Sequence, residues 1–299
     1  LFFTNDSLTV QFRGARVAKC LPFQVRRAER WQDIDIRPVA NPVVANLKIW
    51  QEPSRFGRYC MGVDPAFGSS AENDATVISV WRVWADRALQ VAEFSTPDIS
   101  TLQCAWMIAY LGGLYRDVMV NIEVTGPGTV VMQELDRLKQ HTREMAGPEG
   151  NDYRNVFARM RDFLYRRADS LGGNLVRQWQ TTENTKAILM NRFKNYIEIG
   201  AAEARSLMLI EEMRRVRVDG GHIEADSGHD DRVVAAALAV YAWAEYRLPE
   251  LRAKRWTVEH SDQVEKAGGE DPMDGLLRKF MSIQKIEVKD RLDIDKRTA

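Results

Sequence analysis

The sequence has few cysteines, no long apolar run and no excess of charge of either sign. Its 299 residues include three cysteines that stand far apart, so they form neither a CxxC metal motif nor a disulfide framework. No stretch of about 18 apolar residues is present that could cross a bilayer. Basic and acidic residues number 42 each, so any basic surface for nucleic acid must be local. We therefore expect a protein of a reducing cytosol that does not insert into a membrane.

Composition divides the chain into an irregular beginning, a patterned middle and a charged end. Residues 1–57 are punctuated by four prolines and carry scattered arginines, so we interpret them as an N-terminal arm or linker. Residues 58–248 show the helix and strand patterns of one domain. Residues 249–299 are dense in charge of both signs, and we expect a largely flexible C-terminal tail. Because the chain begins at Leu1 rather than Met, we expect it to be a piece of a longer protein.

The middle of the chain predicts an α/β fold with a mixed sheet. Three strands and a helix precede a fourth strand, and this strand is a continuous apolar run typical of burial on both faces. The expected strands are 59–63, 76–83, 89–94 and 118–124, with a hairpin at 215–225. The expected helices run from Ser100 or Thr101 to about Tyr115, and over 129–140, 182–199 and 229–246. A further short helix follows the one at 182–199 and ends at about Met213.

Acidic residues stand where apolar elements end or begin. Asp64 ends the first strand, Glu123 ends the fourth, and Asp230 and Asp231 open the Ala-rich helix. If the first and fourth strands are parallel neighbours, Asp64 and Glu123 lie at one sheet edge, across a strand spacing of about 4.8 Å. Clustered carboxylates repel one another unless a cation neutralises them, and oxygen ligands without a Cys/His pattern favour Mg²⁺ or Mn²⁺. Two such ions could support phosphodiester cleavage, so the pattern indicates a metal-dependent nuclease.

Each of these acids also has a purely structural interpretation. Asp64 could form a turn, Glu123 could be held in a buried ion pair, and the Asp230–Asp231 pair could cap its helix. All three coincidences would be needed at once, and this favours a shared metal site. His229 is either a neighbour of the cap or a support for a metal ligand. Asp74 is either a turn residue or a peripheral ligand.

The motifs around the acids read "GVDPAFG", followed by "DATVISV", then "NIEVTGPG" and "GGHIEADSGHDDRVVAAALA". Together they resemble the nuclease domain of the large terminase subunit of tailed bacteriophages, over about residues 58–247. The resemblance implies a ribonuclease H-like mixed five-stranded sheet flanked by helices, with a β-hairpin extension. It also implies an endodeoxyribonuclease that uses two Mg²⁺ or Mn²⁺ ions to cut concatemeric phage DNA at the start and end of genome packaging.

The same resemblance implies roles and partners. Asp64 would be the acid that bridges both ions, Glu123 the fourth-strand acid, and Asp230 or Asp231 the helix acid, so all four are candidate catalytic and metal-binding residues. The implied partners are double-stranded DNA, an ATPase motor domain, the portal and the small terminase subunit, in the host cell cytoplasm. The family's motor carries a GxxxxGKS or GxxxxGKT phosphate loop. These 299 residues contain none, so translocation cannot be assigned to them.

Basic groups near these motifs are candidates for sequence-independent contacts with the DNA backbone. Residues 152–167 interleave five arginines with aromatic residues, although an amphipathic segment with its aromatics in the core fits equally well. Lys186 could approach the scissile phosphate, or it could be a solvated helix lysine. The candidate contacts are Arg159, Lys186, Arg192, Arg214, Arg215 and Arg217.

Two other functions fit part of the pattern. An actin- or sugar-kinase-like ATP-binding domain shares the strand arrangement and opens with an acid and a Gly-rich turn. Glu123 and the "HDD" helix fit that function poorly. A non-catalytic module that binds DNA or the portal is the other alternative, and it predicts that Asp64→Ala leaves DNA processing intact.

Overall fold

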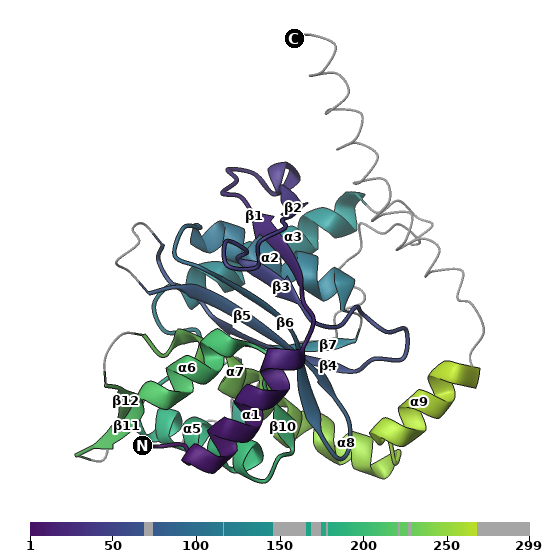
Figure 1. Cartoon of the computed structure of the whole chain (residues 1–299). Coiled ribbons are helices and arrows are strands. Elements are labelled where there is room, and N and C mark those ends of the chain that lie inside the picture. The colour runs from purple at the N-terminus through teal and green to yellow at the C-terminus, as the bar shows by residue number, and fades with distance from the viewer. Residues whose placement is uncertain are drawn as a thin grey trace. The chain divides into compact units, whose positions relative to one another are not determined.

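In the described part of the chain, an eight-stranded mixed sheet forms the centre of the fold (Figure 1). The computed structural model describes residues 1–68, 74–115, 117–145, 166–168, 175–177, 179–220, 222–226 and 229–267. The strand order is β2-β1-β3-β6-β5-β4-β7, with β10 beside β6. The strands are β1 (Leu21–Val25), β2 (Ile36–Pro38), β3 (Leu47–Ile49), β4 (Tyr59–Asp64), β5 (Thr76–Val83), β6 (Ala88–Thr96), β7 (Val118–Ile122) and β10 (Ala202–Glu203).

Strand β4 lies between an antiparallel and a parallel neighbour. It pairs with β5 in antiparallel register and with β7 in parallel register, where Val63 is opposite Ile122. The chain therefore leaves β4 at Asp64 and β7 at Glu123 on the same edge of the sheet. This confirms the expected parallel pairing of the first and fourth strands. Trp179 forms an isolated parallel bridge with Glu123, next to β7.

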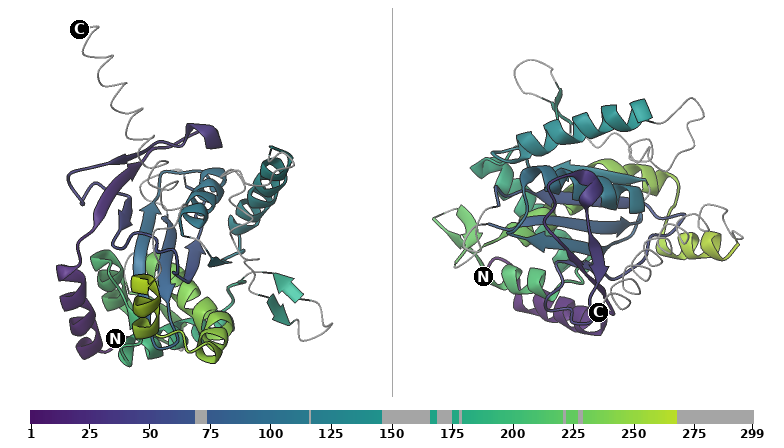
Figure 2. Two further views of the ribbon diagram at one scale, coloured as in Figure 1. Left: turned by 90° about the vertical axis from the view of Figure 1, so that its right-hand side faces the viewer. Right: turned by 90° about the horizontal axis from the view of Figure 1, so that it is seen from above.

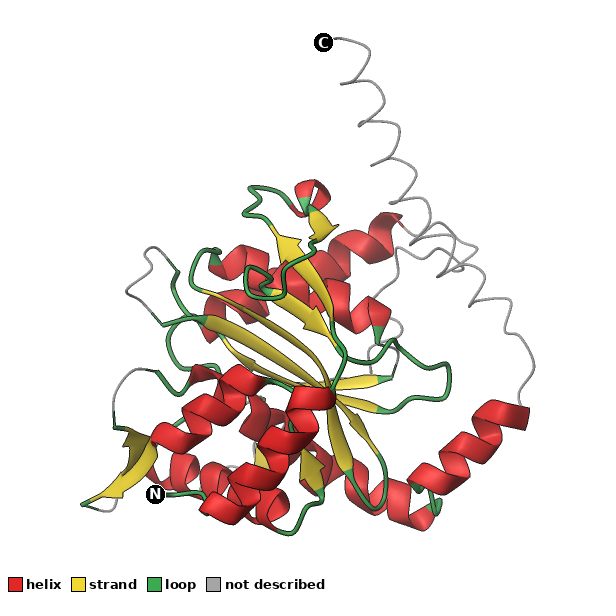
Figure 3. Ribbon diagram, viewed as in Figure 1, coloured by secondary structure: helices red, strands yellow, loops and turns green. Residues whose placement is uncertain are grey.

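Helices cover both faces of the sheet (Figures 2 and 3). One hydrophobic cluster joins one face to α2 and α3, and a second joins the other face to α1, α5, α6 and α7. Their bounds are α1 (Asn5–Val17), α2 (Thr101–Leu114), α3 (Gly128–Met145), α5 (Glu183–Glu198), α6 (Leu207–Arg215) and α7 (Asp231–Ala242). Ser100 caps α2 and Thr182 caps α5, because each side chain accepts a hydrogen bond from a first-turn amide.

Smaller elements complete the fold. The hairpin β11 (Val216–Asp219) and β12 (His222–Ala225) confirms the expected hairpin, and β8 (Arg166–Ala168) pairs with β9 (Leu175–Arg177). A 3-10 turn, η1 (Trp31–Asp33), follows β1. After α7 the chain continues through the π-helical turn η2 (Trp243–Arg247) into α8 (Leu248–Ala253). In the described residues, no helix is long and apolar enough to cross a bilayer.

The mixed α/β fold class is confirmed, but the sheet is larger than the five strands expected. Residues 21–49 add three strands, and residues 202–203 add one beside β6. The expected arm at 1–57 is therefore wrong for most of its length, since residues 1–258 form a single compact unit. Phe3 is 1% exposed and packs edge-on against Phe193. Such contacts between distant segments leave no periodic signal in an irregular stretch.

The C-terminal region is described as far as residue 267. Residues 259–299 form a second unit, of which helix α9 (Val258–Ala267) is described. Helices α8 and α9 therefore replace the first part of the flexible tail expected from residue 249. The remainder of that expected tail, residues 268–299, lies outside the described residues.

Candidate metal centre

Five carboxylates line one cavity at the ends of β4 and β7, the fifth being that of Asp74. The cavity has a volume of about 610 Å³, and its wall includes Asp64, Glu123, Asp230 and Asp231. Asp64 and Glu123 come from the adjacent parallel strands, and the two aspartates come from the start of α7. The structure thus brings together all four acids that the sequence singled out. The sequence around each acid does not by itself determine this arrangement, because the arrangement depends on the packing of α7 against β4.

The electrostatics of this cluster favour a bound cation. Burial raises the pKa of Asp64 well above its usual range, and Glu123, which is hydrogen-bonded to it, raises that pKa further. Asp231 is 8% exposed, and burial raises its pKa to about 6 although the backbone N–H of Ala75 donates to its Oδ2 at 2.8 Å. Protons therefore remain on the cluster at pH values where isolated carboxyls are ionised. A divalent cation would release them by neutralising the charge.

Two glycines allow the backbone to close around the cluster. A Cβ on Gly62 would lie 1.9 Å from the carbonyl oxygen of Ala235, so β4 and α7 meet through their backbones. A Cβ on Gly128 would lie 1.8 Å from the carbonyl oxygen of Glu123. The Gly-Pro-Gly turn after β7 therefore folds back onto the end of its own strand.

Lys186 is the one lysine or arginine among the described residues that line the cavity. Its Nζ lies 2.8 Å from Oδ2 of Asp230, and its side chain is 27% exposed. The lysine offsets part of the negative charge, and Asp230 holds it at the edge of the acidic cluster. A phosphate group entering the cavity would meet this cation.

The other basic candidates lie away from the cavity wall. Arg192 pairs with Glu245, and Arg214 pairs with Glu211 at 2.8 Å. Arg217 donates to the carbonyl oxygens of Arg214 and Val216, whereas Arg215 is exposed. Arg159 lies outside the described residues, as does most of the segment 152–167.

A histidine and a fourth aspartate extend the site beyond the expected four acids. Nδ1 of His229 lies 2.6 Å from Oδ1 of Asp74, and both are at least half exposed. Together with Asp231 they place three ligand atoms within 4.8 Å of one another, as a metal ion requires. This geometry favours the peripheral-ligand interpretation of Asp74 over a simple turn residue. The sequence feature that pointed to this extension of the site was the histidine directly before the aspartate pair.

Fold and site together define a class of protein. A mixed sheet with acids at the ends of two adjacent parallel strands, and more acids at the start of a packed helix, is a ribonuclease H-like domain with a candidate metal centre. Residues 61–242 match the family model described as the terminase RNaseH-like domain, and the chain belongs to this family. Membership supports a nuclease role in DNA packaging.

Solved structures similar to the chain come from two phages and from human cytomegalovirus. The large terminase nuclease from thermophilic phage G20c with bound magnesium is 16% identical, covering 77% of this chain and 96% of that one, with a TM-score of 0.48. The large terminase nuclease domain of Thermus phage P74-26 is 16% identical, covering 79% and 96%, with a TM-score of 0.47. The manganese-soaked human cytomegalovirus terminase nuclease domain is 13% identical, covering 62% and 81%, with a TM-score of 0.40. No curated protein sequence matches the chain.

Proposed function

We propose that this chain is a divalent-metal-dependent endodeoxyribonuclease that cuts concatemeric viral DNA during genome packaging, in the cytoplasm of the host cell. The observation that carries the proposal is the convergence of Asp64, Glu123, Asp230 and Asp231 on one cavity. Family membership supplies the packaging context. By the same membership, the partners would be an ATPase motor domain, the portal and the small terminase subunit.

The donor set fits Mg²⁺ or Mn²⁺. Asp64, at the centre of the cluster, would be shared between two ions, with Glu123 and the Asp230–Asp231 pair as the remaining acidic ligands. The carboxylate oxygens of these acids favour such hard cations. Burial and then the neighbouring carboxylates raise the pKa of Asp64, and a cation would neutralise this negative charge. Bound ions of this kind activate water and stabilise the leaving oxygen of a phosphodiester.

The chain's own groups would hold and orient the substrate. Lys186 is placed to contact a phosphate at the edge of the acidic cluster. A contact with the phosphate backbone is independent of base sequence, so we expect weak sequence preference and an affinity that falls as salt rises. The substrate class is therefore double-stranded DNA, bound mainly through its backbone.

The two alternative functions find less support. An ATP-binding domain would use the turn after β7 to hold phosphate, but this turn closes tightly onto the carbonyl oxygen of Glu123. Family membership also favours the nuclease. A non-catalytic binding module gives no reason for gathering five carboxylates around one cavity, because negative charge repels the DNA backbone.

The proposal is tested by cleavage of supercoiled plasmid in Mn²⁺ or Mg²⁺, with and without a chelator. We expect the wild type to cut only with metal, and Asp64→Asn, Glu123→Gln and Asp231→Asn each to lose cleavage by at least 100-fold. Asp136→Asn, at an exposed acid of α3, is the matched control and should cut normally. If the three metal-site variants cut as fast as Asp136→Asn, the assignment of these acids to the metal site would be refuted. Mutants that fold and bind DNA, beside a wild type that never cuts it, would instead favour the binding module.

A further inference from the structure

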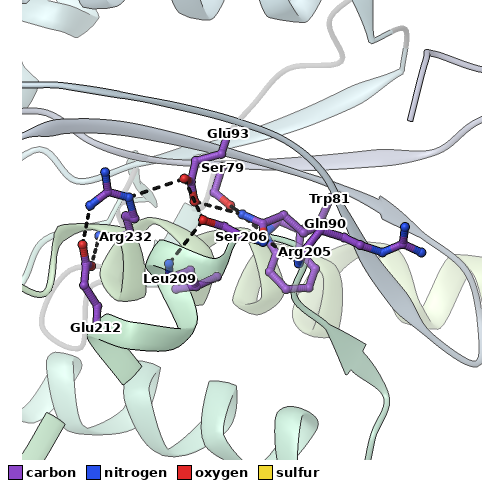
Figure 4. Close-up of polar contacts among 9 residues, drawn as sticks. All are labelled: Ser79, Trp81, Gln90, Glu93, Arg205, Ser206, Leu209, Glu212 and Arg232. Atoms are coloured by element: carbon purple, nitrogen blue, oxygen red, sulfur yellow. Dashed lines mark hydrogen bonds and ion pairs between the residues drawn. The ribbon is translucent and has the colours of Figure 1, made fainter. Parts of the chain in front are cut away.

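A half-buried arginine follows the metal-site aspartates directly in the chain. Arg232 is one residue after Asp231, yet it is not among the residues that line the cavity. Its Nη1 lies 2.5 Å from Oε1 of Glu212 in α6, and its Nε lies 3.4 Å from Oε1 of Glu93 in β6 (Figure 4). The side chains of Glu93 and Glu212 are 3% and 9% exposed, and that of Arg232 is 20% exposed. In the first turn of α7, Asp231 thus faces the cavity, whereas Arg232 faces the two glutamates.

The ion pairs continue into a polar network that joins three elements. Glu93 accepts hydrogen bonds from Oγ of Ser206 at 2.8 Å and from Nε2 of Gln90 at 3.2 Å. Gln90 in turn accepts from the backbone amides of Arg205 and Ser206, both at 2.9 Å. Figure 4 shows these contacts linking β6 to the start of α6 and to Arg232. Helices α6 and α7 are therefore tied to the centre of the sheet and to each other.

Glu212 also takes over the capping of α7. The first amides of a helix need acceptors from outside it, and an aspartate at the N-cap normally supplies one. Asp230 occupies the N-cap position but makes no such hydrogen bond, and its carboxylate faces Lys186 instead. The backbone N–H of Arg232 donates to Oε2 of Glu212 at 2.9 Å. The carboxylates of Asp230 and Asp231 are thereby left available to the cavity.

We propose that Arg232 and Glu212 are positioning residues that hold the first turn of α7 so that Asp230 and Asp231 bind metal. This inference rests on the proposed metal-dependent nuclease. Burying three charged groups offers little stability over an apolar cluster of the same size, so stability alone does not account for the arrangement. Groups that orient metal ligands typically change metal affinity or activity by about 10–100-fold when they are removed.

The test compares Arg232→Met, Arg232→Lys and Glu212→Gln with Arg247→Met. Arg247 is a matched control because it is fully buried and pairs with Asp117 at 2.8 Å, beyond the other end of α7. Mn²⁺ binding to the DNA-free protein is measured by electron paramagnetic resonance, thermal stability by calorimetry, and cleavage as a function of Mn²⁺ concentration. We expect Arg232→Met to weaken Mn²⁺ binding by about 10-fold or more, with Arg232→Lys and Glu212→Gln losing less. Arg247→Met should lower stability without changing Mn²⁺ affinity.

The outcomes separate the two proposals. If Arg232→Met does not fold, the lysine and glutamine variants decide, because each keeps part of the network. Mn²⁺ affinity equal to wild type in the folded variants would overturn the positioning role. So would an equal loss in Arg247→Met, because that loss would follow stability rather than position. A wild type that neither binds Mn²⁺ nor cuts DNA would instead overturn the proposed function itself.

Discussion

Substituting Gly62 by alanine should disable the metal centre without touching any acid. Gly62 lies in β4, two residues before Asp64, and its missing side chain lets α7 rest directly on the strand. An added Cβ would lie 1.9 Å from the carbonyl oxygen of Ala235 and 2.6 Å from the amide nitrogen of Ala239. Both are backbone atoms, so no side-chain rotation can relieve the overlap.

The required displacement follows from these contacts. Ordinary contact begins at 3.4 Å, so α7 must retreat from β4 by about 1.5 Å, the difference between 3.4 and 1.9 Å. Overpacking of this kind costs about 1–3 kcal/mol of folding free energy. Because Asp231 moves with α7 while Asp64 stays with β4, the two acids separate. Misplacement of reacting groups by about 1 Å can cost about 100-fold in rate.

The assay is plasmid cleavage at saturating Mn²⁺, with thermal unfolding measured on the same samples. Gly62→Ala should cut about 100-fold more slowly while remaining folded at the assay temperature. Gly14→Ala in α1 is the control, since its Cβ would meet nothing nearer than Oε1 of Glu203 at 3.9 Å. It should cut normally and be slightly more stable, because alanine favours a helix over glycine. Normal cutting by Gly62→Ala would refute the idea that this close approach sets the site.

Three further predictions concern charge. Metal-free Asp64→Asn should be more stable than wild type at pH 8 by about 1 kcal/mol, because one of four crowded carboxyls is gone, and denaturant unfolding measures this. The pKa of Asp231 is raised from 3.8 to about 6, so the folded state holds a proton that the unfolded chain releases. Wild type should thus lose about 2 kcal/mol relative to Asp231→Asn as the pH rises from 4 to 7, and a stability difference that does not change with pH would contradict the raised pKa. Lys186→Gln should weaken DNA binding and reduce the slope of log affinity against log salt by about 1, whereas an unchanged slope would exclude a phosphate contact.

The elements that build the site were visible in the sequence because their signals are local. Strand β5 ends at the last of its β-branched residues, and helix α7 follows the Ala-rich segment expected as a helix. The sequence allowed a conditional prediction: if β4 and β7 pair in parallel, Asp64 and Glu123 lie at the same sheet edge. Asp64 and Glu123 needed only this one pairing, whereas bringing Asp230 and Asp231 beside them also required the packing of α7 against β4.

The parts that were missed depend on contacts between distant segments. Strand β3 is only three residues long, which is too short to show a period, yet it pairs with β6 and extends the sheet. Arg192 meets Glu245 more than fifty residues away, so its pairing was invisible and it was assigned to DNA. Arg232 left one clue, a charge inside an otherwise apolar helix, but the identity of its partners required the fold.

We propose above that the acids of β4, β7 and α7 hold divalent metal. Crystals soaked in Mn²⁺ and measured at the manganese absorption edge test it directly through anomalous scattering. We expect two peaks beside the carboxylate of Asp64, one of them contacting Glu123, and no peak there in crystals of Asp64→Asn. Peaks absent from this cavity in the wild type, or unchanged in the variant, would contradict it.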